Sequence, residues 1–284
     1  MLTKKLKEFA GLNLLRLCMA VVSVTLFVIL YHIADNGLGV ISWEFLTEMP
    51  KKGMTEGGIL PAIVGTIIVT MITTVLAVPL GMGCAIYLNE YARNGNITRL
   101  IRMSIRNLSG VPSIIYGLFG VLLFVQFMHM GTSILSAGFT LGLMTLPWTV
   151  TSSEEALKNV PDSFRQGSLA LGATKWQMIR TNVLPYAIPG MLTGTILGLS
   201  RAAGETAPIL FTGAAFYLPF IPKSLMNQFM ALPYHLYIMS TQHHAVDKVR
   251  PIAYGTALVL IVLVFFMNLL AIILRYKLRK MKKE

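Results

Sequence analysis

The sequence predicts an all-α protein that crosses a membrane several times, and it does so through its composition and its long apolar segments. Of the 284 residues, 55% are hydrophobic and 13% are charged, against about 25% charged in a typical soluble domain. Because the backbone of a segment inside lipid has to satisfy its own hydrogen bonds, apolar segments of about 20 residues are expected to be helices. This composition excludes a disordered chain, a disulfide-stapled secreted domain and a typical soluble enzyme.

Six segments are apolar and long enough to span the hydrocarbon layer of a membrane. We expect these spans at about 14–34, 60–88, 109–129, 133–152, 187–212 and 252–275. The first span follows a group of lysines and precedes no Ala-x-Ala cleavage pattern, so we interpret it as an uncleaved anchor. The chain 1–284 is then one transmembrane domain. It has a cytoplasmic connection at 153–186 and an irregular external connection at 213–251, with a short helix near 224–240.

The basic residues predict the orientation of the spans. Lys and Arg gather before the first span, in the connections that hold residues 93–106 and 158–180, and after the sixth span. The positive-inside rule places these connections and both termini in the cytoplasm, so we expect a multi-pass protein of a bacterial or archaeal cytoplasmic membrane. The net charge of +12 is therefore assigned to membrane topology and to contacts with anionic lipid, and no nucleic-acid partner is expected.

The cytoplasmic connection predicts two short helices that meet at a glycine corner. Pro161 suits the first position of a helix, where its missing N–H costs nothing. Gly172 suits the left-handed conformation that ends this helix. Thr174 is an N-cap candidate for a second helix, which we expect to run to about Leu184.

Two motifs resemble a known family. Gly172, nine further residues and then Asn182-Val183-Leu184-Pro185 resemble the EAA loop of ABC-importer permeases, with Gln166-Gly167-Ser168 in the place of Glu-Ala-Ala. The segment Arg201–Leu210, RAAGETAPIL, is similar to the R-A-x-G-E-T-A-P-L-L signature of the PstA-type permeases of phosphate importers. The resemblance implies the type I permease fold of ABC importers, with six transmembrane helices and coupling helices between spans four and five.

The resemblance also implies a function, that of a permease subunit of an ATP-driven importer of inorganic phosphate. The implied partners are a second, similar permease, a dimer of ATP-binding subunits and an external phosphate-binding protein. The residues implied to dock on an ATP-binding subunit are Gln166, Ala170, Leu171, Gly172, Ala173 and Thr174. The sequence contains no Gly-x-x-x-x-Gly-Lys-Ser/Thr motif, so we expect no ATPase activity and no cofactor in this chain, with ATP and Mg²⁺ held by the partner subunits.

Two alternative functions stay open at this point. One is a permease for another oxyanion, such as molybdate or tungstate. The other is a self-sufficient secondary transporter or channel, which predicts inverted repeats or acidic residues on several spans, whereas only Glu205 is clearly acidic there. No metal site is expected, because His243 and His244 have no evident third ligand nearby in the sequence.

Arg201 and Glu205 form a charged pair inside the fifth expected span. A charge at the centre of a membrane costs about 2.5–3.5 kcal/mol on insertion scales, and residues four apart on a helix can neutralise each other. Either the pair only neutralises itself, or Arg201 faces a translocation path. The planar donor fork of arginine suits phosphate, and the resemblance places Arg201 on the phosphate path, beside Glu205 and Thr206.

A stripe of small residues recurs every four positions along the same span. Its members are Gly190, Gly194, Gly198 and Ala202. Small residues at this spacing allow another helix to approach closely, and that helix can belong to this chain or to another subunit. Pro79 predicts a kink in the second span, which serves either packing or gating.

Overall fold

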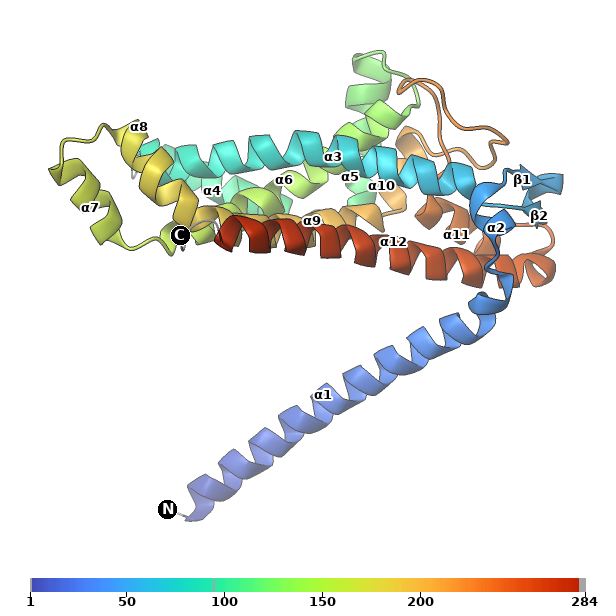
Figure 1. Cartoon of the computed structure of the whole chain (residues 1–284), viewed down its shortest axis with the longest axis horizontal. Helices are drawn as coiled ribbons and strands as arrows, with labels where there is room; N and C mark the ends of the chain where they lie inside the picture. The colour runs from blue at the N-terminus through green and yellow to red at the C-terminus, as the bar shows by residue number, and fades with distance from the viewer. Residues whose placement is uncertain (1, 94, 281–284) are drawn as a thin grey trace.

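The computed structural model describes residues 2–93 and 95–280, and most of this part is helical (Figure 1). Five helical segments are long and apolar enough to cross a membrane: Gly11–Val40, Leu60–Tyr91, Ile134–Lys158, Lys175–Ala203 and Val246–Lys277. A sixth crossing results if the bent pair Asn96–Leu108 and Ser113–Phe127 counts as one span. Lys282 and Lys283, part of the basic C-terminal segment, lie outside the described residues.

Most of the helices follow one another with short connections, and the long one is residues 213–231, between the tenth and the eleventh helix. Their bounds are α1 (Leu2–Gly37), α2 (Trp43–Thr47), α3 (Leu60–Ile86), α4 (Asn96–Leu108), α5 (Ser113–Gly120), α6 (Ile134–Lys158), α7 (Asp162–Ala170), α8 (Lys175–Met178), α9 (Leu184–Ala203), α10 (Ala207–Thr212), α11 (Leu232–Thr241) and α12 (Val246–Lys280). Three π-helical segments extend or join them: Tyr87–Tyr91, Val121–Phe127 and Ile179–Val183. Short 3-10 turns lie at Leu38–Val40 and Lys52–Met54, and the strands β1 (Pro50–Lys51) and β2 (Glu56–Gly57) pair antiparallel.

Two of the expected spans differ from the helices in the structure. In place of a straight span at 109–129, the segment Ser113–Phe127 meets α4 at a bend of 103°. The helix expected at 187–212 begins at Lys175 and ends at Ala203, so the segment is broken before α10. Proline favours both breaks, because it suits the first turn of a helix and disfavours the helical conformation of the residue before it, and one proline lies at the start of α5 and another at the start of α10.

The structure is a long bundle with two distinct ends (Figure 1). The α7 end holds α7 and α8, and both chain termini point toward it. The hairpin end holds β1, β2 and α11, and its helix Leu232–Thr241 is shorter than the one expected near 224–240. The helices α3, α6 and α9 form the body between the two ends, with α12 alongside.

The inner face of α3 is lined by threonines, which are unusual in an apolar span. Thr66, Thr70 and Thr73 are buried, and each hydroxyl donates a hydrogen bond of 2.7 to 2.8 Å to the carbonyl four residues earlier. These polar groups are therefore satisfied inside their own helix, which lets α3 pack closely on α6. The helix continues through Pro79 without interruption.

Helix α1 diverges from the rest of the bundle (Figure 1). Its most apolar stretch has no buried residue in the described chain. It meets α12 near the hairpin end, where a Cβ on Gly37 would lie 2.8 Å from the carbonyl oxygen of Tyr254. His32 adds a 3.1 Å hydrogen bond to the Tyr254 hydroxyl, so α1 is attached to the bundle mainly by its C-terminal turns.

Candidate functional site

The charged pair expected in the fifth span lies where that span is broken. Arg201 is in the last turn of α9, where the helix dipole favours a positive charge, and Gly204 follows the end of the helix. Glu205 lies in the break, and the Nε atom of Arg201 is 3.2 Å from its Oε1 atom. The ion pair therefore forms between a helix end and the segment after it, and not along one helix face.

Arg201 is held on two sides and open elsewhere. Its Cζ atom lies 5.7 Å from the centre of the Trp148 ring of α6, and Nε donates to Glu205. The side chain of Arg201 is 52% exposed, whereas that of Glu205 is 15% exposed. Among the residues that the structure describes, Nη1 and Nη2 of Arg201 have no hydrogen-bond acceptor. Two donors of the guanidinium are thus available to an anionic ligand.

Thr206 completes the break between the two helices. Its backbone carbonyl accepts a 3.1 Å hydrogen bond from the N–H of Leu210, while its side chain does not cap α10. Non-helical backbone at membrane depth is tolerated where it is buried in protein or lines a water-filled path. The break at 204–206 is therefore compatible with either of these two settings.

The connection between α6 and α9 has the glycine corner that the sequence predicts. Gly172 has φ +83°, in the left-handed region, and follows the end of α7. Thr174 forms a capping box with Gln177. Oγ1 of Thr174 accepts a 3.3 Å hydrogen bond from the backbone N–H of Gln177, and the backbone N–H of Thr174 donates a 2.8 Å hydrogen bond to the side-chain Oε1 of Gln177. Pro161 lies one position before the helix, as its N-cap.

The second short helix does not end at Leu184. It continues from Lys175 through the π-helical segment Ile179–Val183 into α9, and one helix reaches Ala203. Pro185 lies inside this helix, directly after the π-helical segment, where the regular i→i−4 hydrogen-bond pattern is already altered. Helix α8 and the turn that holds Arg201 therefore belong to one continuous helix.

The residues implied to dock on an ATP-binding subunit gather at the α7 end (Figure 1). Gln166, Ala170, Leu171, Gly172 and Thr174 are exposed, and Ala173 is half-buried. Leu171 is 90% exposed, and the larger side chains near it are exposed too: Phe164, Leu169 and Trp176. Exposed apolar side chains that gather at one tip form a surface suited to a protein partner.

An ion pair that the sequence analysis missed joins α7 to two spans. The Nη2 atom of Arg165 donates to Oε1 of Glu90 at 2.8 Å and to the carbonyl of Leu157 at 2.9 Å, and Nη1 donates to the carbonyl of Val160 at 2.8 Å. The Glu90 side chain is only 4% exposed. The hydrogen bond and charge of Glu90 raise the pKa of Arg165 above its ordinary value, so the guanidinium stays charged. A glutamate at the end of an apolar segment was the one available signal.

A second ion pair attaches α4 to the same region. Nε of Arg102 donates to Oε1 of Glu154 at 2.7 Å, and Nη2 donates to the carbonyl of Leu88 at 2.8 Å. Glu154 lies in the last turns of α6, and its side chain is 10% exposed. The α7 end of the bundle is therefore held by two largely buried carboxylates, each paired with an arginine from another element.

The stripe of small residues packs within this chain. A Cβ added to Gly190 would lie 2.9 Å from the Cβ of Ala156, and one added to Gly194 would lie 2.1 Å from that of Ser152. A Cβ added to Gly198 would lie 3.6 Å from that of Trp148. All three partners are on α6, and Ala202 is buried as well. These glycines thus let α9 approach α6 closely and place Trp148 near Arg201.

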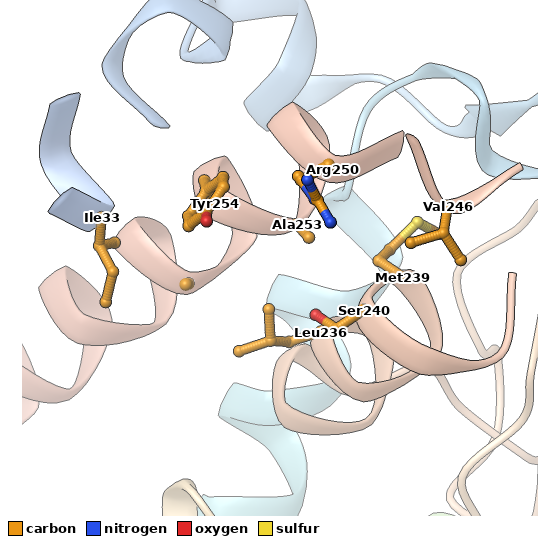
Figure 2. A pocket seen from close by; sticks show the side chains of 9 residues that line it. Ile33, Leu236, Met239, Ser240, Val246, Arg250, Ala253 and Tyr254 are labelled. Atoms are coloured by element: carbon orange, nitrogen blue, oxygen red, sulfur yellow. The ribbon is translucent and has the colours of Figure 1, made fainter. Parts of the chain in front are cut away.

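An apolar cavity of about 280 Å³ lies at the hairpin end, between α1, α11 and α12 (Figure 2). Its lining includes Ile33, Leu236, Met239, Arg250 and Tyr254. It includes neither Arg201 nor any residue of the break, so it is separate from the candidate site. Within the described part of the chain, no three His, Cys, Asp or Glu residues are grouped as metal ligands.

Residues 77–280 match the family described as "Binding-protein-dependent transport system inner membrane component". The chain belongs to this family. It is 32% identical over 281 residues to the probable ABC transporter permease protein YqgI of Bacillus subtilis, covering 95% of each chain. It is 37% identical to the phosphate transport system permease protein PstA 1 of Mycobacterium tuberculosis H37Rv, over 78% of this chain and 70% of that protein. The probable phosphate transport system permease protein PstA of Methanocaldococcus jannaschii is 34% identical, over 84% of this chain and 83% of that protein.

Solved structures show the fold of this family member. A chain of a bacterial ABC transporter that imports alginate matches with a TM-score of 0.64 and 15% identity, over 94% of this chain and 98% of that one. A chain of the methionine ABC transporter MetNI, in an inward-facing conformation, matches with a TM-score of 0.59 and 17% identity, over 78% of this chain and 94% of that one. The expected permease fold of ABC importers is therefore confirmed, as is the resemblance to PstA-type permeases.

Proposed function

We propose that this chain is one of two permease subunits of an ATP-driven importer of inorganic phosphate. The relatives named phosphate transport system permeases, at 34–37% identity, support phosphate as the solute. The structural observation that carries the proposal is the half-exposed guanidinium of Arg201, with Nη1 and Nη2 unoccupied beside a break in the span. Phosphate is an anion that such a donor pair binds well.

In this proposal phosphate passes Arg201 and stays there only briefly. Glu205 holds the Nε side of the guanidinium and keeps the span formally neutral when no anion is bound. A phosphate dianion that approaches Nη1 and Nη2 also meets the negative charge of Glu205, which opposes tight binding. A transport path needs this combination, because a solute that binds too tightly does not leave.

The α7 end faces the cytoplasm in this proposal, as do both termini. A dimer of ATP-binding subunits holds ATP and Mg²⁺ and docks on the exposed tip around Leu171. When these subunits close, they displace α7 and α8. The continuous helix from Lys175 to Ala203 carries the movement to Arg201, and the Arg165–Glu90 pair carries it to the end of α3.

The remaining partners follow from the same proposal. A second, similar permease completes the path in the cytoplasmic membrane, and an external phosphate-binding protein delivers the solute to the hairpin end. This chain then needs no cofactor of its own, because the partner subunits hydrolyse ATP.

Uptake by the reconstituted complex tests the proposal. The chain is purified with its co-expressed partners and placed in vesicles, and labelled phosphate uptake is measured with and without ATP on the side of the ATP-binding subunits. We expect ATP-dependent uptake that unlabelled phosphate suppresses and that molybdate and tungstate leave unchanged. Uptake by the isolated chain without ATP contradicts the proposal, and so does stronger competition by molybdate or tungstate than by phosphate.

A further inference from the structure

Helix α4 combines three features that set it apart from the spans. It is amphipathic, it carries Arg99, Arg102 and Arg106, and its sequence contains no acidic residue. It meets the following segment at a bend of 103°, so it runs across the direction of that segment. A helix of this kind lies in the surface plane of a membrane when its apolar side can reach the acyl chains.

Contacts with the bundle fix how α4 is rotated about its own axis. Arg102 points inward, where it bonds Glu154 and the carbonyl of Leu88. Ile105, close to Arg102 on the helix surface, packs against the apolar cluster formed by α3, α6 and α9. Thr98 is buried and donates a 2.8 Å hydrogen bond to the carbonyl of Arg93. One side of α4 is therefore attached to the protein.

The two remaining sides of α4 have opposite character. At 100° per residue, Ile97, Leu100, Ile101 and Leu108 lie within about 100° of one another, about a third of a turn from the attached side, and the small polar Ser104 lies among them. Their exposed fractions are 77%, 61%, 40% and 44%. Arg99 and Arg106 are exposed on the side opposite to these apolar residues. The side of α4 that is attached to the protein thus lies between its apolar side and its basic side.

We propose that α4 is an interfacial helix that binds anionic phospholipid in the leaflet at the α7 end. Its apolar side enters the acyl-chain region, and Arg99 and Arg106 bind the phosphates of the headgroups. Charge complementarity selects this occupant, since no ion pair between described residues includes Arg99 or Arg106. The attached side lies between the two, as the geometry requires of a helix that borders protein, lipid and water.

This surface is connected to the coupling elements. Arg102 joins α4 to Glu154, and α6 ends at Lys158, shortly before α7. Lipid that holds α4 in place therefore also holds the last turns of α6. The lipid proposal itself is independent of the solute that the protein transports.

Lipid-specific quenching tests the proposal. In the full chain with Cys18→Ser and Cys84→Ala, a fluorophore is attached at Leu100→Cys and the protein is placed in vesicles of phosphatidylcholine. A small fraction of doxyl-labelled phosphatidylglycerol or doxyl-labelled phosphatidylcholine is then added. We expect the anionic quencher to act about three-fold more strongly, and this preference to disappear in the double variant Arg99→Gln/Arg106→Gln.

Two controls make the result specific. Arg180→Gln removes an exposed arginine outside α4, and it should leave the preference for phosphatidylglycerol unchanged. A fluorophore at Leu171→Cys, on the exposed tip, should be quenched by neither lipid. Equal quenching by both lipids at position 100 overturns the binding of anionic headgroups. No quenching at position 100 overturns the membrane contact, because the apolar side then faces water or another protein.

Discussion

The guanidinium of Arg165 in α7 and the buried carboxylate of Glu90, 75 residues earlier in the chain, form an ion pair at 2.8 Å. Arg165 also donates to the carbonyls of Leu157 and Val160 at the end of α6. One side chain therefore fixes the first coupling helix to the ends of two spans. In the proposed importer, a force on α7 reaches α3 and α6 through this contact.

Replacing Glu90 with Gln tests the contact. The substitution keeps the size of the side chain and removes its charge, so the largely buried Arg165 loses its main partner. We expect the free energy of unfolding to fall by about 3 kcal/mol, because the largely buried Arg165 then keeps only the exposed Asp162 as a charged partner. We also expect ATP hydrolysis by the complex to continue while uptake falls. Thermal unfolding and paired hydrolysis and uptake assays measure these effects.

Asp162→Asn is the matched control for this prediction. Asp162 also pairs with Arg165, at 3.2 Å, but its side chain is 83% exposed. An exposed ion pair contributes less than about 1 kcal/mol, so we expect little change in unfolding and normal coupling. Equal effects of the two substitutions would show that burial of Glu90 does not matter.

The closest approach between α6 and α9 gives a second prediction. A Cβ on Gly194 would lie 2.1 Å from the Cβ of Ser152, whereas a Cβ on Gly198 would lie at an ordinary 3.6 Å from that of Trp148. We expect Gly194→Ala to lower the thermal unfolding temperature and the yield of assembled complex, and Gly198→Ala to leave both nearly unchanged. Ser152→Gly should restore the Gly194→Ala variant. Failure of this rescue would contradict the packing of the two helices.

The sequence predicted what depends on local chemistry. Apolar length indicated the five long helical segments and the bent pair that can count as a sixth, and the turn chemistry of Gly172 and Thr174 located the corner between α7 and α8. These signals work because a left-handed position or a helix cap depends on a few neighbouring residues, and because lipid contact selects apolar side chains whatever the rest of the fold is.

The sequence did not predict where the long helices end or continue, nor which distant residues pair with each other. Hydropathy is high on both sides of the break at 204–206, so it did not reveal that α9 ends before Glu205. It also gave no sign that α8 and α9 form one helix, because the π-helical segment between them contains Arg180 and Asn182. Arg165 and Glu90 are brought together only by the packing of the spans, which no local pattern encodes.

The corner at Gly172 gives a third prediction. Apart from its chain neighbours, no described residue has an atom within 4 Å of a Cβ added there, so it is the backbone conformation with φ +83° that resists substitution. We expect Gly172→Val to displace the tip and uncouple ATP hydrolysis from uptake, because β-branched residues rarely adopt positive φ. Gly172→Asn should retain most coupling, since asparagine tolerates this region. If both variants couple normally, the corner does not position the tip.

Arg201 gives a fourth prediction, which concerns transport without a change in stability. Its side chain is half-exposed and glutamine can still donate a hydrogen bond to Glu205, so Arg201→Gln should assemble and unfold nearly like the original protein. We expect it to abolish phosphate uptake, and Arg201→Lys to retain only a small part, because an ammonium group lacks the planar fork. Uptake of labelled phosphate by the purified complexes measures both. Normal uptake by Arg201→Gln would remove this residue from the path.

His235 in α11 gives a prediction about pH. It is buried, and neither ring nitrogen has a hydrogen-bond partner in the described part of the chain. Burial, aided by the charge of His243, lowers its pKa to about 4 from 6.5, so as the pH falls from 6.5 to 4 the unfolded chain binds a proton that the folded chain does not. Stability should therefore decrease over this range by up to about 3 kcal/mol. His244 is exposed, so His244→Leu is the matched control. The thermal unfolding temperature should depend less on pH in His235→Leu than in His244→Leu. The same pH dependence in both variants would assign the effect to other groups.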